Sequence, residues 1–110
     1  MPTISPDASL QTVLTTFETS PGDCADLIEE LGDAYAVFIS KQPGFVSAAL
    51  HVNDAQTRVA NYSQWETREH FKDMLKSDEM RRRNKRINAL CRSFEPVMYE
   101  VFATHAATRT

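Results

Sequence analysis

Two amphipathic helical patterns, each lying between segments of strand-type composition, constrain the fold of this chain more than any other feature of its sequence. The first begins at Ser20 and Pro21, a suitable N-cap followed by a proline at the first helical position. From there to Phe38, apolar residues recur at spacings of three and four, which predicts an amphipathic helix of about 18 residues. The second pattern begins at Thr67 and restarts at Ser77, and both residues suit the N-cap position.

Four further segments have the composition of strands. They are Leu10 to Glu18, Phe45 to Val52, Thr57 to Trp65 and Ser93 to Phe102. Residues 53–56 suit a hairpin loop, and Pro96 marks an edge or a bulge in the last strand. The order β-α-β-β-α-β predicts an α+β fold of the ferredoxin-like type, with one antiparallel sheet and helices on one face. We expect one domain at 10–102, with flexible tails at 1–9 and 103–110.

The predicted strands are apolar on both faces. In the second strand, alternation places Val46, Ala48 and Leu50 on one side and Phe45 and Ala49 on the other. In the last strand, it places Val97, Tyr99 and Val101 opposite Phe94, Met98 and Phe102. A solvated antiparallel face would alternate to polar residues instead. We therefore expect a homodimer, a dimeric α/β-barrel in which a second copy buries the face that carries Ala60 and Tyr62.

Charge and motif content exclude several classes of function. The formal net charge is -3, which gives no electrostatic support for binding nucleic acid. No apolar stretch approaches the ~20 residues of a membrane span, and the N-terminus lacks signal-peptide features, so we expect a cytoplasmic protein with no membrane partner. Cys24 and Cys91 form no CxxC motif, and the histidines have no metal-ligand spacing. We expect structural thiols and no metal.

Asn61 and Trp65 are the candidate functional residues with the clearest pattern. Period-two alternation places both on one face of the third strand, together with Val59 and Ser63. An asparagine in mid-strand is disfavoured, and a buried amide costs about 1–3 kcal/mol unless it finds partners. An amide donor beside an indole wall suits a planar, oxygenated ring. In the alternative interpretation, Asn61 satisfies a neighbouring loop backbone and Trp65 belongs to the core.

Two segments resemble a known family. They read GFVSAALH (residues 44–51) and VANYSQWETREHF (residues 59–71). Both resemble the antibiotic biosynthesis monooxygenase family, and most closely its cofactor-independent anthrone oxygenases of polyketide pathways. The resemblance extends from Leu10 to Phe102 and implies a homodimer whose two sheets pack face to face. It also implies that Asn61 and Trp65 match the asparagine and tryptophan implicated in substrate binding and oxygen activation.

The chain departs from this family at two tyrosines. Leu50 and Phe71 stand where the anthrone oxygenases have phenols, which puts a proton-relay role in doubt. The family's helix arginine falls near Lys85 or Arg86, with the register left open. His51 is the nearest titratable alternative, but it points to the face opposite Leu50.

A haem-degrading branch of the family resembles residues 74–78. That branch has a tryptophan where Met74 stands and an axial histidine where Asn84 stands. An amide is a poor ligand for haem iron, which disfavours this reading. Asn84 nevertheless lies within the apolar stripe of its helix and is expected to face the cavity. The candidate substrate-binding residues are Leu50, Phe71, Met74 and Asn84.

The sequence thus predicts a cofactor-independent monooxygenase. Its substrate would be a planar aromatic phenol, quinol or anthrone-like polyketide. Its partners would be this substrate, dioxygen and a second copy of the chain. The alternatives are a non-catalytic binding or accessory protein, and an isomerase or cyclase on the same scaffold. The basic run at residues 81–86 is either a solvated face, paired with Asp73, Asp78 and Glu79, or a funnel for an anionic substrate.

Overall fold

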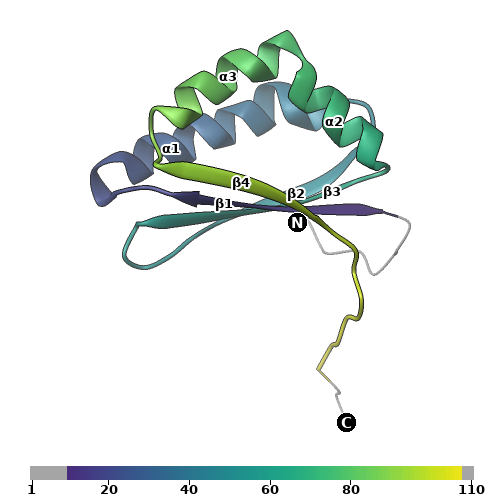
Figure 1. Cartoon of the computed structure of the whole chain (residues 1–110). Coiled ribbons are helices and arrows are strands. Elements are labelled where there is room, and N and C mark those ends of the chain that lie inside the picture. The colour runs from purple at the N-terminus through teal and green to yellow at the C-terminus, as the bar shows by residue number, and fades with distance from the viewer. Residues whose placement is uncertain (1–9, 108–110) are drawn as a thin grey trace.

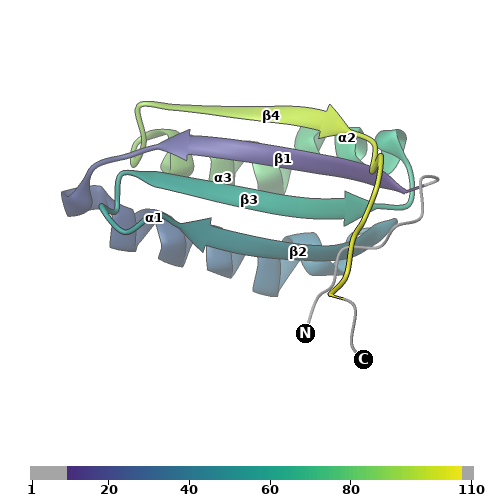
Figure 2. The same cartoon turned by 90° about the horizontal axis from the view of Figure 1, so that it is seen from below.

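A computed structural model describes residues 10–107 of the chain. Its elements are β1 (Gln11–Glu18), α1 (Pro21–Asp33), η1 (Ala34–Phe38), η2 (Ile39–Lys41), β2 (Phe45–Val52), β3 (Arg58–Trp65), α2 (Arg68–Lys76), α3 (Asp78–Asn88) and β4 (Ser93–Tyr99). The strands form one antiparallel sheet in the order β2-β3-β1-β4 (Figure 2). The helices cover one face and leave the other open (Figure 1). This is the predicted ferredoxin-like α+β fold. The predicted tail at 1–9, and residues 108–110 of the predicted tail at 103–110, lie outside the described residues.

The helix starts follow the sequence closely, whereas the end of the first helix does not. Thr67 Oγ1 accepts a hydrogen bond from the His70 amide, and Ser77 Oγ accepts one from the Met80 amide, so both predicted caps are confirmed. Ser20 stands at the N-cap of α1 without a side-chain capping hydrogen bond. After Asp33, the expected helix continues as one segment of π-helix, η1, and one of 3₁₀-helix, η2.

A β-bulge corrects the predicted faces of β2. Phe45 pairs with Trp65, whereas Ser47 already pairs with Gln64, so one extra residue is inserted between them. The insertion reverses the alternation and places Phe45 on the helix-covered face. Its ring centroid lies 5.3 Å from that of Trp65. The prediction that Phe45 opposes Leu50 was wrong, because simple alternation takes no account of the bulge.

The last strand is shorter than predicted. β4 ends at Tyr99 instead of Phe102, and residues 100–107 form no helix or strand and extend away from the sheet (Figure 1). The Phe102 side chain is fully exposed. Within β4, Val97 and Tyr99 are exposed, whereas Phe94 and Met98 pack against the core, as the alternation predicted.

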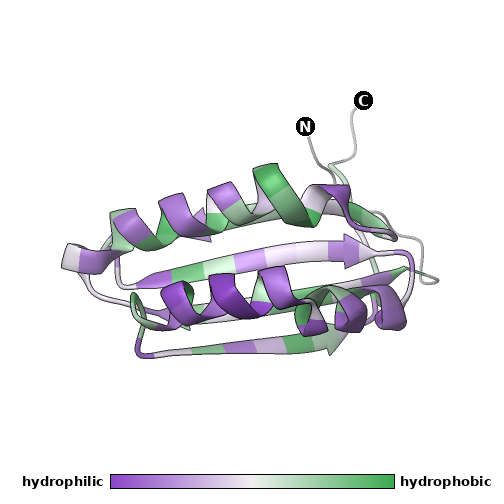
Figure 3. Cartoon of the chain, turned by 90° about the horizontal axis from the view of Figure 1, so that it is seen from above, coloured by the Kyte–Doolittle hydropathy of each residue, from purple (hydrophilic) through white to green (hydrophobic). Residues whose placement is uncertain are grey.

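The core lies between the sheet and the helices. Its most deeply buried apolar members are Val13, Leu27, Ala34, Val59, Trp65, Ile87 and Cys24. The outward surface of α3 is mainly hydrophilic (Figure 3). Within residues 10–107, no group of three or more His, Cys, Asp or Glu could hold a metal ion, and no helix is long and apolar enough to cross a membrane.

The basic run on α3 pairs with Glu79, as the sequence predicted, and also with Asp33 and Glu30 of α1, which the sequence did not predict. Arg83 is buried, and its Nη1 lies 2.9 Å from Asp33 Oδ2 of α1. Its Nε lies 2.8 Å from Glu79 Oε2, one turn back on the same helix. Arg86 pairs with Glu30 of α1. Arg83 therefore ties α3 to α1 and is not part of a solvated face.

Candidate active site

A small cavity lies between the helix-covered face of the sheet and the helices. Its volume is about 50 Å³. Its wall comes from β1, β3 and β4 and from the helices, with Thr15, Phe17, Leu31, Tyr35, Ile39, Asn61, Ser63, Phe71, Met74, Leu75, Met80, Asn84, Ile87, Phe94 and Pro96. The structure thus brings together four residues singled out from the sequence, namely Asn61, Phe71, Met74 and Asn84.

Asn61 is the most unusual residue of the cavity wall. In the sheet it pairs with Thr15 of β1 on one side and with Leu50 of β2 on the other, and it is only 8% exposed. Its Nδ2 donates a hydrogen bond to Tyr35 Oη at 2.6 Å. Its Oδ1 is buried and has no hydrogen-bond partner among residues 10–107. A buried acceptor without a partner costs about 1–3 kcal/mol, so a ligand that donates a hydrogen bond here would recover that cost.

Tyr35 connects Asn61 to the rest of β3. Its hydroxyl is hydrogen-bonded to the side chains of both Asn61 and Ser63. Trp65 Nε1 donates to Ser63 Oγ at 3.3 Å. Burial raises the pKa of Tyr35, and this effect exceeds the lowering by the two hydrogen bonds. The phenol therefore stays neutral, and its proton remains available for donation.

Trp65 supports the cavity from behind. The residue is 0% exposed, and it is absent from the cavity wall. Phe71, which does line the cavity, packs edge-on against the indole at a centroid distance of 5.7 Å. A direct contact between Trp65 and a ligand stays a prediction.

Leu50 faces a second, wider space. A groove of about 610 Å³ runs along β2 beside α1, η1 and η2, and Leu50 and Phe45 line it. Tyr35 lines both this groove and the small cavity. His51 is exposed on the opposite face, across from Ala60, which is the orientation expected from the sequence.

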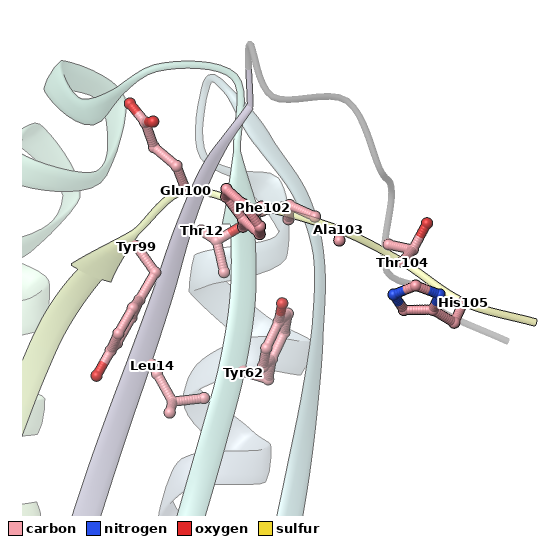
Figure 4. A pocket seen from close by; sticks show the side chains of 10 residues that line it. Thr12, Leu14, Tyr62, Tyr99, Glu100, Phe102, Ala103, Thr104 and His105 are labelled. Carbon is pink, nitrogen blue, oxygen red and sulfur yellow. The ribbon is translucent and has the colours of Figure 1, made fainter.

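A wider hollow lies elsewhere, on the open face of the sheet. It has a volume of about 710 Å³ and is bordered by Leu14, Tyr62, Tyr99 and the segment 100–105 (Figure 4). Asn61, whose buried Oδ1 has no partner among residues 10–107, lines the helix-covered cavity instead. We therefore place the candidate active site between the sheet and the helices.

Sequence reasoning missed Tyr35 and Ser63. Tyr35 belongs to the apolar stripe of the first helix, where it reads as core. A phenol on a buried helix face still requires a hydrogen-bond partner, and that requirement was an available signal. Ser63 lies between Asn61 and Trp65 on the same face of β3, which its spacing already indicated.

Comparison with known proteins identifies the family. The sequence model of the antibiotic biosynthesis monooxygenase family matches residues 10–86. The chain belongs to this family. It is 35% identical over 74 residues to tetracenomycin-F1 monooxygenase of Streptomyces glaucescens, and these residues make up 67% of this chain and 66% of that protein. The match thus covers just under two thirds of the length of the relative.

Solved structures share the fold at lower sequence identity. A mutant of SnoaB, a cofactor-independent oxygenase from Streptomyces nogalater, aligns with a TM-score of 0.78 and 20% identity, over 88% of this chain and 97% of SnoaB. A conserved protein from Methanosarcina mazei Go1 also reaches 0.78, with 9% identity, over 86% of this chain and 95% of that protein. At such identities, the likeness concerns the fold alone.

Proposed function

We propose that this chain is a cofactor-independent monooxygenase that acts on a planar aromatic phenol, quinol or anthrone-like substrate. The observation that carries the proposal is the buried Asn61 side chain, which lines the cavity and whose Oδ1 has no hydrogen-bond partner among residues 10–107. The family of the chain and the monooxygenase activity of its relative from Streptomyces glaucescens support the same chemistry.

The proposed reaction needs no outside reductant. In an anthrone-like substrate, a ring CH₂ loses a proton, and the resulting anion donates an electron to dioxygen. One oxygen atom then becomes the new carbonyl oxygen, and the other leaves as water with the two hydrogens of the CH₂. Asn61 would accept a hydrogen bond from the substrate hydroxyl through Oδ1 and, once its amide has turned over, would donate one from Nδ2 to the substrate oxyanion, where the negative charge gathers. Phe71, Met74 and Asn84 would hold the ring.

Binding requires the cavity to widen. Drug-sized ligands occupy about 300–1,000 Å³, whereas this cavity holds about 50 Å³. Asn84 of α3 is half-buried and Pro96 of β4 is exposed, so solvent reaches the cavity wall at these two residues. We propose that the ring enters there, by separation of α3 from the edge strand β4.

We also propose that the open face of the sheet is buried in a homodimer. Leu14, Tyr62, Val97 and Tyr99 lie on this face, and the exposed Phe102 lies beside it (Figure 4). A solvated sheet face would be polar at these positions. Light scattering should give about twice the chain mass of 12.4 kDa. Val97→Glu should lower that mass, whereas Val37→Glu, on exposed η1, should leave it unchanged. A monomeric wild type would refute the dimer.

Oxygen uptake with an anthrone, measured against the uncatalysed background, tests the activity. Asn61→Ala should lower the rate by about 10²–10³, the usual effect of losing one hydrogen-bond donor to an oxyanion. Thermal melts must show that the variant is folded. A wild type that binds the phenol but never exceeds the background would favour a non-catalytic binding protein, the function to which the missing phenols at Leu50 and Phe71 point. A folded, fully active Asn61→Ala would remove Asn61 from the mechanism.

A further inference from the structure

The phenol of Tyr35 is the only side chain hydrogen-bonded to the Asn61 amide within residues 10–107. We propose that Tyr35 is a positioning residue, which acts on the substrate through Asn61 by holding its amide against the cavity. The inference rests on the proposed function, because it takes Asn61 as the group that meets the substrate oxygen.

A change of helix type directs the Tyr35 side chain toward Asn61. α1 ends at Asp33, and Tyr35 lies in the π-helical segment η1, which follows directly. A π-helical turn changes the direction of the side chains after it, and such turns are frequent at functional sites. The Tyr35 ring packs against Phe45 at a centroid distance of 5.9 Å, which restricts its movement. The hydroxyl thus approaches Asn61 from the helix side, opposite the strand that carries the amide.

A neutral phenol is suited to hold an amide that must serve two forms of a substrate. A hydroxyl both donates and accepts hydrogen bonds. When Tyr35 accepts from Asn61 Nδ2, as found here, Oδ1 is left to accept from a substrate hydroxyl. When the amide turns over, Tyr35 can donate to Oδ1, and Nδ2 is left to donate to a substrate oxyanion. Tyr35 therefore provides a partner for the inner end of the amide before and after the substrate ionises.

Ser63 provides the second partner that this exchange requires. In the orientation found here, the Tyr35 hydroxyl accepts from Asn61 and its own proton is free to bond Ser63. After the amide turns over, the proton is directed to Asn61, and Ser63 can donate to the phenol oxygen. The indole of Trp65, a donor only, holds Ser63 Oγ from the other side. The pattern Asn-x-Ser-x-Trp on one face of β3 thus builds a connected chain of hydrogen bonds.

A double-mutant cycle separates positioning from an independent role. Tyr35→Phe, Asn61→Ala and the double variant are compared with wild type in anthrone oxidation. We expect Tyr35→Phe to lower kcat by up to about 100-fold, as misplacement of a catalytic group can, and to change KM by less than about threefold. In the Asn61→Ala background, the same substitution should change kcat by less than about twofold. Thr19→Val removes another buried hydroxyl, bonded to Leu90 O, and should leave kcat unchanged.

Two results would overturn the inference. Tyr35→Phe could lower kcat by the same factor in both backgrounds, or leave it within about twofold of wild type. If Tyr35→Phe melts below the assay temperature, Ser63→Ala takes its place in the double-mutant cycle. The same two results, with Ser63→Ala in place of Tyr35→Phe, would then overturn the inference. If wild type does not oxidise the anthrone, the proposed monooxygenase activity is rejected, and the role of Tyr35 is tested separately. The cycle is then read from the binding of 1,8-dihydroxyanthraquinone, where additive effects reject the inference and non-additive effects support it.

Discussion

Leu50 lies directly opposite Asn61 in the β2–β3 ladder, on the face that the helices cover. The Cβ atoms of directly opposed residues are about 4.5–5.5 Å apart, within reach of a long side chain. Leu50 also borders the wide groove, so a larger side chain has room at this position. A hydroxyl introduced here can therefore reach the Asn61 amide from the strand side.

Leu50→Tyr should stabilise the protein relative to Leu50→Phe. Both variants add a ring of nearly the same size, but only the tyrosine can donate a hydrogen bond to Asn61 Oδ1. One such bond to a buried acceptor contributes about 1 kcal/mol. Urea denaturation measures the difference in unfolding free energy between the two variants. Equal stabilities would mean that the hydroxyl does not reach the amide.

The fold was predictable because its determinants are local. The capping residues Thr67 and Ser77 and the helical spacing mark the elements without reference to the rest of the chain. The bulge at Val46 was not predictable in the same way, because the pairing of Phe45 with Trp65 and of Ser47 with Gln64 is set between two strands. The early end of β4 at Tyr99 likewise depends on pairing, since β1 supplies its partners.

The site was predictable on the strand and not on the helix. Period-two alternation placed Asn61 on the helix-covered face, and the uniform geometry of β3 preserved that register. Tyr35 lies beyond the point where α1 changes to a π-helix, so a regular helical period no longer describes its direction. The ion pair of Arg83 with Asp33 joins two helices and has no signature in either one.

Trp65→Ala should mainly lower the stability of the fold, and its effect on ligand affinity should be secondary. The side chain is fully buried between Phe45 and Phe71, and truncating such a tryptophan costs about 3–5 kcal/mol. Trp65→Phe should retain most of the stability and lose only the indole donor to Ser63. Calorimetric melts of both variants test this. A Trp65→Ala variant with an unchanged Tm and lost phenol binding would instead make Trp65 a ligand contact.

Glu79 should make the stability depend on pH below neutrality. The hydrogen bond from Arg83 lowers the pKa of this carboxyl below its ordinary value of 4.5. The folded state therefore favours the ionised form, and the stabilisation is fully present above pH 4.5. It is lost as the pH falls through the lower folded value.

The variant Glu79→Gln isolates this effect. The free energy of unfolding of wild type should exceed that of the variant at pH 7, and the gap should close as the pH falls below 4.5. Asp54→Asn, in the exposed hairpin loop, is a matched control for the loss of one carboxylate. If the difference in unfolding free energy between wild type and Glu79→Gln is constant from pH 7 to pH 3, the ionisation of Glu79 is not coupled to folding.

Gly44 and Gly32 should respond in opposite directions to the same substitution. Gly44 has a φ of +82°, and a Cβ there would lie 2.2 Å from Cγ of His70. Its carbonyl also accepts the Glu66 amide at 2.7 Å, which fixes the turn before β2. Gly44→Ala must therefore strain the backbone by about 1–2 kcal/mol and also displace the His70 ring from Thr67 Oγ1, to which it is bonded at 2.8 Å.

Gly32 is the matched control, because it lies within α1, and a Cβ there meets no described atom within 4 Å. Gly32→Ala should raise the unfolding free energy by about 0.5–1 kcal/mol through helix propensity. Gly44→Ala should lower the unfolding free energy by more than the cost of backbone strain alone. Adding His70→Ala to Gly44→Ala should recover the part of the loss that comes from the clash with the His70 ring. Thermal and urea denaturation of these variants measure both effects. Equal changes at the two glycines would contradict the assigned turn, since the left-handed conformation and the approach of His70 make a Cβ unfavourable at Gly44 and not at Gly32.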